Sequence, residues 1–283
     1  MPLILDGKIA AQTVKDRLQQ EMEKIKSSGR VPGLAVVLVG DNPASVVYVG
    51  MKKKACEALG YYSEEHRLSK ETSEKQLLQL IQSLNENPKI HGILVQLPLP
   101  GHLRADQIVN AIDPRKDIDG LHPVNLGKLL AGEKGLRPCT PLGVMTLLDH
   151  FKVSVSGKRA VVIGRSNLVG KPLGLMLLEA NATVTFCHSK TPHLEEVVRQ
   201  AELVVAAIGK PHFVTGDMIW PGAVVVDVGT SKTADGKLAG DVDYENVVSK
   251  VFAISPVPGG VGPMTIALLL KNTYQAFLEQ IGF

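Results

Sequence analysis

The sequence has few cysteines, few aromatic residues, little net charge and no long hydrophobic run. Its three cysteines are widely separated and form no CxxC pair, so it supports neither a disulfide framework nor a cysteine zinc site. Aromatic residues make up 4% of the 283 residues. The formal net charge of +3 is small and dispersed, which argues against the concentrated basic surface of a nucleic-acid-binding or membrane-surface protein.

The hydrophobic runs are too short for a membrane protein. Runs such as residues 34–39 and 266–270 fall far short of the roughly 20 apolar residues that a spanning helix needs. Asp6 and Lys8 interrupt the N-terminus where a secretory signal would have a continuous apolar segment. We therefore expect a cytoplasmic protein with no metal site.

Glycine and proline are plentiful, with 27 and 17 residues. Short β-branched runs alternate with stretches of helical periodicity, which predicts an α/β fold with parallel sheets. In the first half, strands are expected at residues 34–39, 62–68 and 92–96, and helices at 7–29, 42–60 and 73–87. In the second half, strands are expected at 159–163, 183–187, 203–206, 223–228 and 252–254, a helix is expected to open at 140–141, and further helices at 169–180, 193–200 and 264–280.

The pattern changes between Pro98 and Pro141, where glycine, proline and charged residues interrupt every periodic stretch. We therefore expect the boundary between two α/β domains in this segment. The domains would be residues 1–139 and 140–283, with the active site in a cleft between them. The C-terminal helix, residues 264–283, is expected to pack back on the first domain. Thr140 is expected to cap the helix that opens at the junction, with Pro141 in its first turn.

A glycine-rich segment in the second half is typical of a phosphate site. The strand ending at Ile163 runs directly into Gly164–Gly174, which opens a helix, and free N–H groups at a helix start favour an anion. Ser166 occupies the second glycine position of the GxGxxG pattern, so the motif alone is weak and a simple glycine turn stays an alternative. The place of this glycine-rich segment, between a strand and the helix that follows it, favours a Rossmann-type dinucleotide-binding domain.

The next strand indicates which dinucleotide would bind. NAD-specific Rossmann folds place an acidic residue at the end of the second strand to hold the ribose 2′-hydroxyl. Here that strand ends Cys187-His188-Ser189-Lys190, without an acid. Because Arg165, Ser189 and Lys190 would suit a 2′-phosphate, NADP is favoured over NAD. Lys190 could equally be a solvated surface charge.

Tyr48 and Lys52 are the most informative residues of the first half. They stand four residues apart and therefore share a helix face. A buried lysine with a lowered pKa can act as a base, although the run Lys52-Lys53-Lys54 could equally be a solvated face. The YxxxK pattern also occurs in short-chain dehydrogenases, but there it follows the glycine motif, whereas here it precedes it by more than a hundred residues.

Three further segments have compositions that indicate a functional rather than a purely structural role. Residues 96–100, Gln-Leu-Pro-Leu-Pro, follow a buried strand at the end where open α/β sheets bind ligands. Residues 116–120, Lys-Asp-Ile-Asp-Gly, place two carboxylates in a loop, although Asp-Gly is also a common turn pair. In residues 256–265 six of ten positions are glycine or proline, which indicates a rigid backbone packed against a ligand or a neighbouring domain.

Together these segments resemble the bifunctional methylenetetrahydrofolate dehydrogenase/methenyltetrahydrofolate cyclohydrolase family. Each match is weak alone, but all of them occur in the family's order and spacing along the whole chain. The matching segments are residues 48–52, 96–100, 116–120, 138–141, 164–172, 226–229 and 256–265.

The resemblance implies two activities. The first is oxidation of 5,10-methylenetetrahydrofolate to the methenyl form with NADP, and the second is hydrolysis of that product to 10-formyltetrahydrofolate. It also implies a first domain that binds folate and carries catalysis, tetrahydrofolate derivatives as ligands, a homodimer, and a place in the one-carbon metabolism that serves purine, methionine and histidine biosynthesis.

The resemblance further assigns roles to residues. Lys52 is the central catalytic residue, Tyr48 orients the folate, Gln96 tunes the lysine and Asp119 anchors the pterin ring. A protonated lysine would repel the methenyl cation, so Lys52 needs a lowered pKa or a polarising partner. The other substrate-binding residues implied are Leu97, Pro98, Pro258 and Gly259, and the cofactor-binding residues are Gly164, Arg165, Ser166, Ser189 and Thr230. Many relatives have Ile at the place of Thr230, so a backbone contact is expected there.

Three alternatives stay open from the sequence. The first is a relative with the dehydrogenase step alone, using NADP or NAD. The second is a generic Rossmann oxidoreductase acting on an amino or hydroxy acid, which leaves the motifs of the first half unexplained. The third is a non-catalytic folate- or nucleotide-binding protein, since a fold does not establish an activity.

Overall fold

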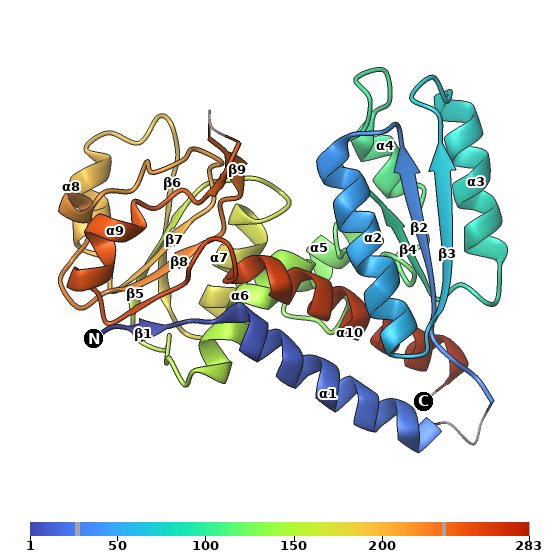
Figure 1. The fold of residues 1–283 in the computed structure, drawn as a ribbon, viewed down its shortest axis with the longest axis horizontal. Coiled ribbons are helices and arrows are strands. Elements are labelled where there is room, and N and C mark those ends of the chain that lie inside the picture. The colour runs from blue at the N-terminus through green and yellow to red at the C-terminus, as the bar shows by residue number, and fades with distance from the viewer. Residues whose placement is uncertain (26–28, 234–235, 283) are drawn as a thin grey trace. The chain divides into compact units, whose positions relative to one another are not determined.

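The computed structural model describes residues 1–25, 29–233 and 236–282. The predicted α/β class with parallel sheets is confirmed, and the chain forms two compact units (Figure 1). Unit 1 comprises Met1–Gln12 and Thr140–Thr265, and unit 2 comprises Thr13–Cys139 and Ile266–Phe283. Residues 26–28, at the end of the first expected helix, and Phe283, at the end of the last, lie outside the described residues.

Unit 2 is built on a three-stranded parallel sheet. Its strands are β2 (Gly33–Val39), β3 (Tyr62–Leu68) and β4 (Gly92–Val95), in the order β3-β2-β4. All seven residues of the central strand β2 are buried, as its unbroken apolar run predicts. Because β3 and β4 pair on opposite sides of β2, the carboxyl ends of β2 and β4 form a topological switch point, where such sheets bind ligands.

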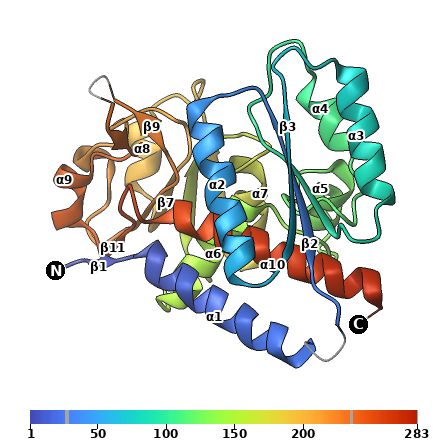
Figure 2. The same cartoon turned by 45° about the vertical axis from the view of Figure 1, so that its right-hand side comes forward.

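Helices cover both faces of this sheet. Figure 2 shows α2 (Pro43–Ala58) on one side and α3 (Glu74–Glu86) with α4 (Ala105–Asn110) on the other. The α3 side is a hydrophobic cluster in which Leu77 and Ile81 lie among the buried residues of β2 and β4. α3 begins at a capping box formed by Ser73 and Gln76, which satisfies free N–H groups of its first turn.

The segment between residues 98 and 141, where no helix or strand was expected before residue 140, contains two short helices. They are α4 and α5 (Pro123–Leu130). α5 starts where the His122 ring nitrogen accepts the N–H of Val124 and Pro123 occupies the first turn. Six to eight residues are too few for helical periodicity to stand out in the sequence, which explains why the pattern did not predict them.

Unit 1 is built on a six-stranded parallel sheet in the order β1-β11-β8-β7-β5-β6. β5 pairs with β6 on one side and with β7 on the other, so the switch point of this sheet lies between β5 and β7. The strands are β1 (Leu3–Ile4), β5 (Arg159–Ile163), β6 (Thr183–Cys187), β7 (Leu203–Ala206), β8 (Val224–Asp227) and β11 (Ala253–Ile254). A separate antiparallel pair is formed by β9 (Ser231–Lys232) and β10 (Leu238–Ala239).

The N-terminal residues differ from the division expected from the sequence. Residues 1–12 were expected with the first half of the chain, but here they belong to unit 1 with the second half. The reason is that β1 pairs in parallel with β11, with Leu3 opposite Ala253 and Ile4 opposite Ile254. A strand of two residues has no periodicity by which the sequence could reveal it.

The helices of unit 1 lie on both faces of its sheet. α8 (Leu194–Arg199) and α9 (Tyr244–Val247) lie on one side and α7 (Gly170–Glu179) on the other (Figure 1). α6 (Cys139–His150) begins one residue before the expected N-cap Thr140. The Thr140 hydroxyl instead hydrogen-bonds the Thr265 hydroxyl at 3.0 Å. The described residues of the unit also form 3-10 turns at Gly216–Met218 and Val248–Lys250.

Two long helices contribute residues to both units. α1 (Gly7–Ile25) belongs to unit 1 up to Gln12, and α10 (Val261–Ile281) belongs to unit 1 up to Thr265. Within unit 2, the backbone carbonyl of Leu270 on α10 accepts the phenol of Tyr61 at 3.3 Å. Among the described residues, none of the helices combines the length and the apolar character needed to cross a membrane.

We expect Gly33→Ala to destabilise unit 2, because a Cβ at this position would lie 1.8 Å from the backbone oxygen of Lys89. The backbone would have to move, at a cost of about 1–3 kcal/mol in the free energy of unfolding. The matched control is Gly127→Ala in α5, where an added Cβ meets nothing within 4 Å. This substitution should stabilise the helix by about 0.5–1 kcal/mol. Chemical denaturation measures both, and equal effects of the two substitutions would contradict the prediction.

Candidate active site

Lys52 lies on the buried face of α2 rather than on its solvated face. The buried residues of this helix are Ser45, Val49, Lys52 and Cys56, which follow one another at the helical spacing of three to four residues. Lys53 and Lys54 are exposed. The reading of the lysine run as a solvated surface is therefore wrong for its first member and right for the other two.

The ammonium of Lys52 donates a hydrogen bond to the side-chain oxygen of Gln96 at 2.9 Å. Gln96 directly follows β4, and its backbone N–H donates to the carbonyl of Val37 in β2 at 2.8 Å. Its side-chain amide also donates to the carbonyl of Leu97 at 2.7 Å. Both ends of the amide are therefore engaged, which orients its oxygen toward the lysine at the carboxyl ends of β2 and β4.

Burial governs the protonation of this pair. Lys52 is 6% exposed, and the loss of water around its ammonium lowers its pKa below the ordinary value. The nearby Asp119 carboxylate opposes that shift. Burial likewise raises the pKa of Asp119, and the charge of Lys52 opposes it. The site thus favours neutral forms of both groups more than water would, as a site for proton transfer requires.

The two carboxylates of the loop 116–120 have different tasks. Asp117 is buried and accepts the backbone N–H of His122 at 2.8 Å and the side-chain amide of Asn125 at 2.9 Å, so it holds the turn into α5. Burial raises its pKa to about 6. Asp119, two residues on, is half-buried and acts electrostatically on Lys52. Only the second is therefore placed to take part in chemistry.

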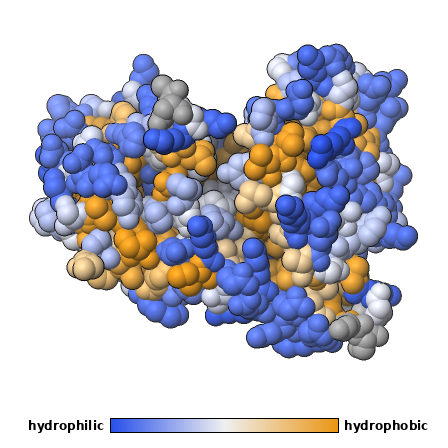
Figure 3. All heavy atoms as spheres, viewed as in Figure 1, coloured by the Kyte–Doolittle hydropathy of each residue, from blue (hydrophilic) through white to orange (hydrophobic). Residues whose placement is uncertain are grey.

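Tyr48 lies one turn before Lys52 on α2 and is 37% exposed. Beside it on the same helix, Val47 and Met51 are also exposed, at 61% and 48%. Figure 3 shows hydrophobic side chains gathered at the surface beside α2. Exposed apolar side chains next to a buried polar group are typical of a ligand site that binds a flat, partly apolar molecule.

Two residues near Asp119 were not assigned a function from the sequence. The thiol of Cys139 donates to the carbonyl of Ile118 at 3.1 Å, and its interactions with Asp119 contribute to the pKa shifts of both groups. The amide of Asn272 on α10 donates to the same carbonyl and to that of Arg137, each at 2.8 Å. Cys139 lies in a recognised motif, but nothing in the sequence pattern links Asn272 to this loop.

The glycine-rich segment of unit 1 follows β5 at the switch point of the sheet. A Cβ on Gly164 would lie 2.4 Å from the carbonyl oxygen of Ala207, which follows β7, and a Cβ on Gly170 would lie 2.4 Å from the carbonyl oxygen of Gly164. The hydroxyl of Ser166 accepts the backbone N–H groups of Val169 and Gly170 at 3.1 and 3.4 Å. Only glycine fits at these two positions, which leaves a close backbone turn suited to a phosphate at the start of α7.

The remaining predicted cofactor residues lie at the surface of unit 1. Arg165, Ser189 and Thr230 are exposed, and so is Lys190. Arg165 follows β5, Ser189 and Lys190 follow β6, and Thr230 follows β8, so all are at the carboxyl side of the sheet. Exposed cations and hydroxyls at this edge fit an anionic dinucleotide.

The predicted substrate residues are divided between the two units. Lys52, Gln96 and Asp119 come together in unit 2, and Leu97 and Pro98 follow Gln96 directly. Pro258 and Gly259 belong to unit 1, where the carbonyl of Gly259 accepts the N–H of Gly7 at 2.8 Å. Pro98 and Pro258 both follow cis peptide bonds.

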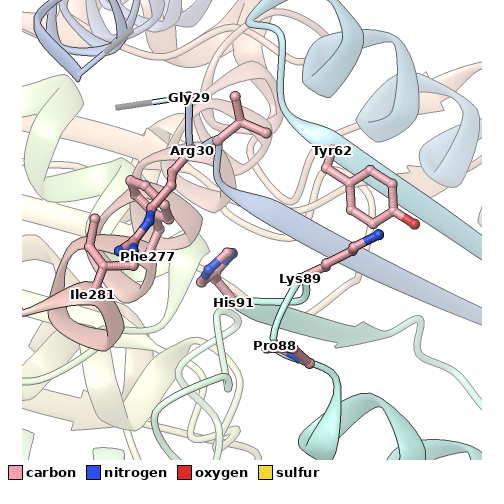
Figure 4. Close-up of a pocket in the computed structure, with 9 residues that line it drawn as sticks. Gly29, Arg30, Tyr62, Pro88, Lys89, His91, Phe277 and Ile281 are labelled. Carbon is pink, nitrogen blue, oxygen red and sulfur yellow. The ribbon is translucent and has the colours of Figure 1, made fainter. Parts of the chain in front are cut away.

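A cavity of about 480 Å³ in unit 2 contains none of the predicted site residues. Figure 4 shows His91 between Phe277 and Lys89, with Tyr62 beside the lysine. Tyr62 begins β3 and His91 precedes β4, so this cavity lies at the amino ends of the strands. Gln96 lies at the opposite, carboxyl ends, where parallel sheets bind their ligands. In the described part of the chain, no group of three or more His, Cys, Asp or Glu side chains is placed to hold a metal ion.

Comparison with known proteins identifies the family. The model of the tetrahydrofolate dehydrogenase/cyclohydrolase NAD(P)-binding domain matches residues 138–281, and that of the catalytic domain matches residues 5–119. A bifunctional protein FolD from Moorella thermoacetica is 55% identical over 273 residues, which are 96% of this chain and 98% of that protein. The chain belongs to the tetrahydrofolate dehydrogenase/cyclohydrolase family. The resemblance inferred from the seven segments is confirmed.

Solved structures of this family have the same fold. The FolD enzyme from Campylobacter jejuni is 48% identical and superposes with a TM-score of 0.96 over 99% of both chains. The enzyme from Trypanosoma brucei, solved with NADP cofactor and an inhibitor, is 37% identical with the same TM-score over 100% of this chain and 99% of that one. The alternative of a generic Rossmann oxidoreductase is not supported, because the family models together span both halves of the chain.

We expect Gln96→Glu to raise the pKa of Lys52, because it would place a second carboxylate next to the ammonium in a site with little water. The ε-carbon resonance of Lys52 in protein labelled with carbon-13 lysine reports that pKa during a pH titration. Gln79→Glu, at an exposed position of α3, is the control and should leave it unchanged. A Lys52 pKa that stays constant or falls in the Gln96 variant would contradict the assignment.

Proposed function

We propose that this chain oxidises 5,10-methylenetetrahydrofolate with NADP and hydrolyses the methenyl product to 10-formyltetrahydrofolate. The observation that carries the proposal is a buried lysine, Lys52, hydrogen-bonded to Gln96 and electrostatically coupled to Asp119. Both family domains and the bifunctional relatives support it. The presence of all three residues favours both activities over the dehydrogenase step alone.

In the hydrolysis, Lys52 acts as the base. A water oxygen bonds to the methenyl carbon, and one water proton passes to the neutral amine of Lys52. The hydroxyl of this adduct then loses its proton to solvent as the formyl C=O forms, the bond between that carbon and N5 of the folate breaks, N5 takes the proton held by Lys52, and the formyl group stays on N10. The lowered pKa of Lys52 increases the neutral fraction that can accept the proton and reduces repulsion of the cationic substrate. Gln96 holds the amine in place through its side-chain oxygen.

The substrate is held by the surroundings of the lysine. Tyr48 is exposed one turn away and can stack on or orient the pterin, and the Asp119 carboxylate can accept hydrogen bonds from it. Leu97 and Pro98 extend this surface after Gln96. Pro258 and Gly259 of the other unit are the remaining proposed contacts.

Bound NADP would supply the acceptor for the hydride that leaves the methylene carbon. The backbone around Gly164 and Ser166 is proposed to hold the pyrophosphate, and Arg165 and Ser189 the 2′-phosphate. A backbone contact from Thr230 is proposed at the nicotinamide end. Residues of unit 1 would thus hold NADP, while Lys52, Gln96 and Asp119 of unit 2 would act on the folate.

An absorbance assay tests the two activities separately. With 5,10-methylenetetrahydrofolate, the chain should reduce NADP faster than NAD at equal concentrations. With 5,10-methenyltetrahydrofolate and no nucleotide, its absorbance should decay faster than in buffer alone. Reduction of nucleotide without this second activity would make the chain a monofunctional dehydrogenase, and tight binding without turnover would make it a binding protein.

We expect Lys52→Met to abolish the hydrolysis while retaining much of the dehydrogenase activity, because hydride transfer needs no base at this position. Loss of general-base catalysis corresponds to about 100-fold or more. Lys53→Met is the matched control, because Lys53 is the next residue on α2 and is exposed. If purified Lys52→Met protein hydrolyses methenyltetrahydrofolate at the wild-type rate, the lysine does not have the proposed role.

We further propose a cytoplasmic homodimer that works in one-carbon metabolism. The cysteines are free and buried, which fits a reducing compartment. β6 is the last strand of the six-stranded sheet, and Thr183, Thr185 and Phe186 on it are exposed. An open strand edge with an exposed aromatic residue can pair with a second copy of the chain.

Thr185→Lys should weaken the dimer, because it places a charge in the middle of the proposed edge. Sedimentation velocity at micromolar concentration should then show a shift from dimer to monomer mass. Ser154→Lys, at an exposed position of unit 1 away from β6, is the control and should leave the mass unchanged. A wild-type chain that sediments as a monomer would rule out the homodimer.

A further inference from the structure

Two aspartates of unit 1 are almost completely buried and have no part in the chemistry described above. Asp227, the last residue of β8, is 3% exposed, and Asp241 is 0% exposed. A buried carboxylate is costly unless N–H groups compensate its lost water. Their hydrogen bonds therefore reveal what they hold in place.

Asp227 holds the chain that follows β8 and the segment around residue 241. One of its oxygens accepts the backbone N–H of Gly229 at 2.9 Å and that of Asp241 at 3.0 Å. The other accepts the N–H of Val242 at 2.9 Å. Gly229 immediately precedes Thr230, the proposed cofactor contact.

Asp241 holds the chain that follows β7. Its side chain accepts three successive backbone N–H groups, those of Ile208 at 2.6 Å, Gly209 at 3.0 Å and Lys210 at 2.7 Å. Three consecutive N–H groups converging on one carboxylate fix the backbone of the whole turn. Because Asp227 in turn binds the backbone N–H of Asp241, the two carboxylates connect the segments after β7 and β8 in series.

Two glycines leave room for these carboxylates. A Cβ on Gly229 would lie 2.3 Å from a carboxylate oxygen of Asp241, and a Cβ on Gly240 would lie 1.9 Å from a carboxylate oxygen of Asp227. Any other residue at either position would displace a carboxylate or the backbone. The two aspartates, Gly229 and Gly240 therefore form one closely packed arrangement, in which each glycine makes room for a carboxylate.

This arrangement adjoins the switch point of the sheet. The turn held by Asp241 begins directly after Ala207, whose carbonyl oxygen packs against Gly164 of the glycine-rich segment. Ala207 also donates its N–H to the carbonyl of Ile163, the last residue of β5, at 2.8 Å. A shift of the 208–210 turn would thus also displace the backbone that is proposed to bind the pyrophosphate.

We propose that Asp227 and Asp241 are positioning residues of the dinucleotide site. They fix the backbone turns after β7 and β8 against the glycine-rich segment, so that the site is formed before the cofactor arrives. This inference rests on the proposed cofactor site and adds two residues that do not contact the cofactor. Pre-formed sites bind more tightly because less order must be gained on binding.

The chemistry of the two side chains provides the test. Asp→Asn keeps the shape but replaces a carboxylate oxygen by an NH2 group that would face N–H donors and leave at least one of them unpaired. Asp241→Asn should therefore loosen the 208–210 turn. Amide hydrogen exchange of Ile208, Gly209 and Lys210 in the ligand-free protein should accelerate, and titration calorimetry should give a dissociation constant for NADP raised by about tenfold or more. Asp227→Asn should have the same effect on NADP and also accelerate exchange at Gly229 and Val242.

The controls separate positioning from loss of stability. Val225→Ala removes buried volume from β8 without touching either carboxylate and should lower the melting temperature while leaving the NADP dissociation constant within about twofold. Hydrolysis of methenyltetrahydrofolate, which needs no nucleotide, should persist in all three variants. If Asp241→Asn does not fold, Gly229→Ala applies the same displacement through its Cβ and should weaken NADP in the same way.

The outcomes are distinct. An Asp241→Asn protein that folds and binds NADP as tightly as wild type overturns the inference, and so does weakening by Val225→Ala to the same extent. A wild-type chain that binds no NADP overturns both the cofactor site and the inference. A wild-type chain that binds NADP but does not turn over folate contradicts the proposed function alone, because the binding and exchange measurements do not depend on turnover.

Discussion

The proposed catalytic site depends on the free-energy cost of burying the ammonium of Lys52. An ammonium removed from water must either find a strong acceptor or lose its proton more readily. The acceptor that the structure provides is the neutral amide of Gln96. A neutral oxygen compensates less of the lost hydration than a carboxylate in the same place would, so burial prevails and the pKa falls. A buried lysine with a lowered pKa is suited to the role of base that we propose for it.

Much of unit 2 serves to keep this arrangement in place. Asn42 caps α2 by accepting the N–H groups of Ala44 and Ser45, which fixes where the helix begins and therefore which lysine faces inward. A start displaced by one residue would rotate the buried face by about 100°. In the loop before α5, Asp117 is committed to the turn into that helix, which leaves Asp119 available to the lysine.

In unit 1 the buried charged groups are compensated by several hydrogen-bond donors, whereas Lys52 in unit 2 has one neutral acceptor. The two buried aspartates of unit 1 each receive three backbone N–H groups, so burial there organises the backbone rather than preparing a proton transfer. Burial raises the pKa of Asp227 to about 6, and its hydrogen bonds with the backbone oppose the shift. The two units thus place buried charge near the carboxyl ends of their strands for different proposed purposes: Lys52 would act as a base, and Asp227 and Asp241 would position the backbone of the cofactor site.

How much of this could be predicted from the sequence depends on what each residue contacts. The apolar runs of β2 and β5 predicted their strands, and the helical spacing of Ser45, Val49 and Cys56 around Lys52 contained the signal that this lysine is buried. The two-residue strand β1 had no such signal, because its existence depends on a partner about 250 residues away.

The role of Asp241 was hidden for a related reason. Its partners are the backbone N–H groups of residues 208–210, and a backbone N–H has the same chemistry at every residue except proline. No residue type at those positions could reveal the contact. Side chains that bind other side chains leave a pattern of complementary residues in the sequence, whereas side chains that bind backbone become recognisable only once the chain is folded.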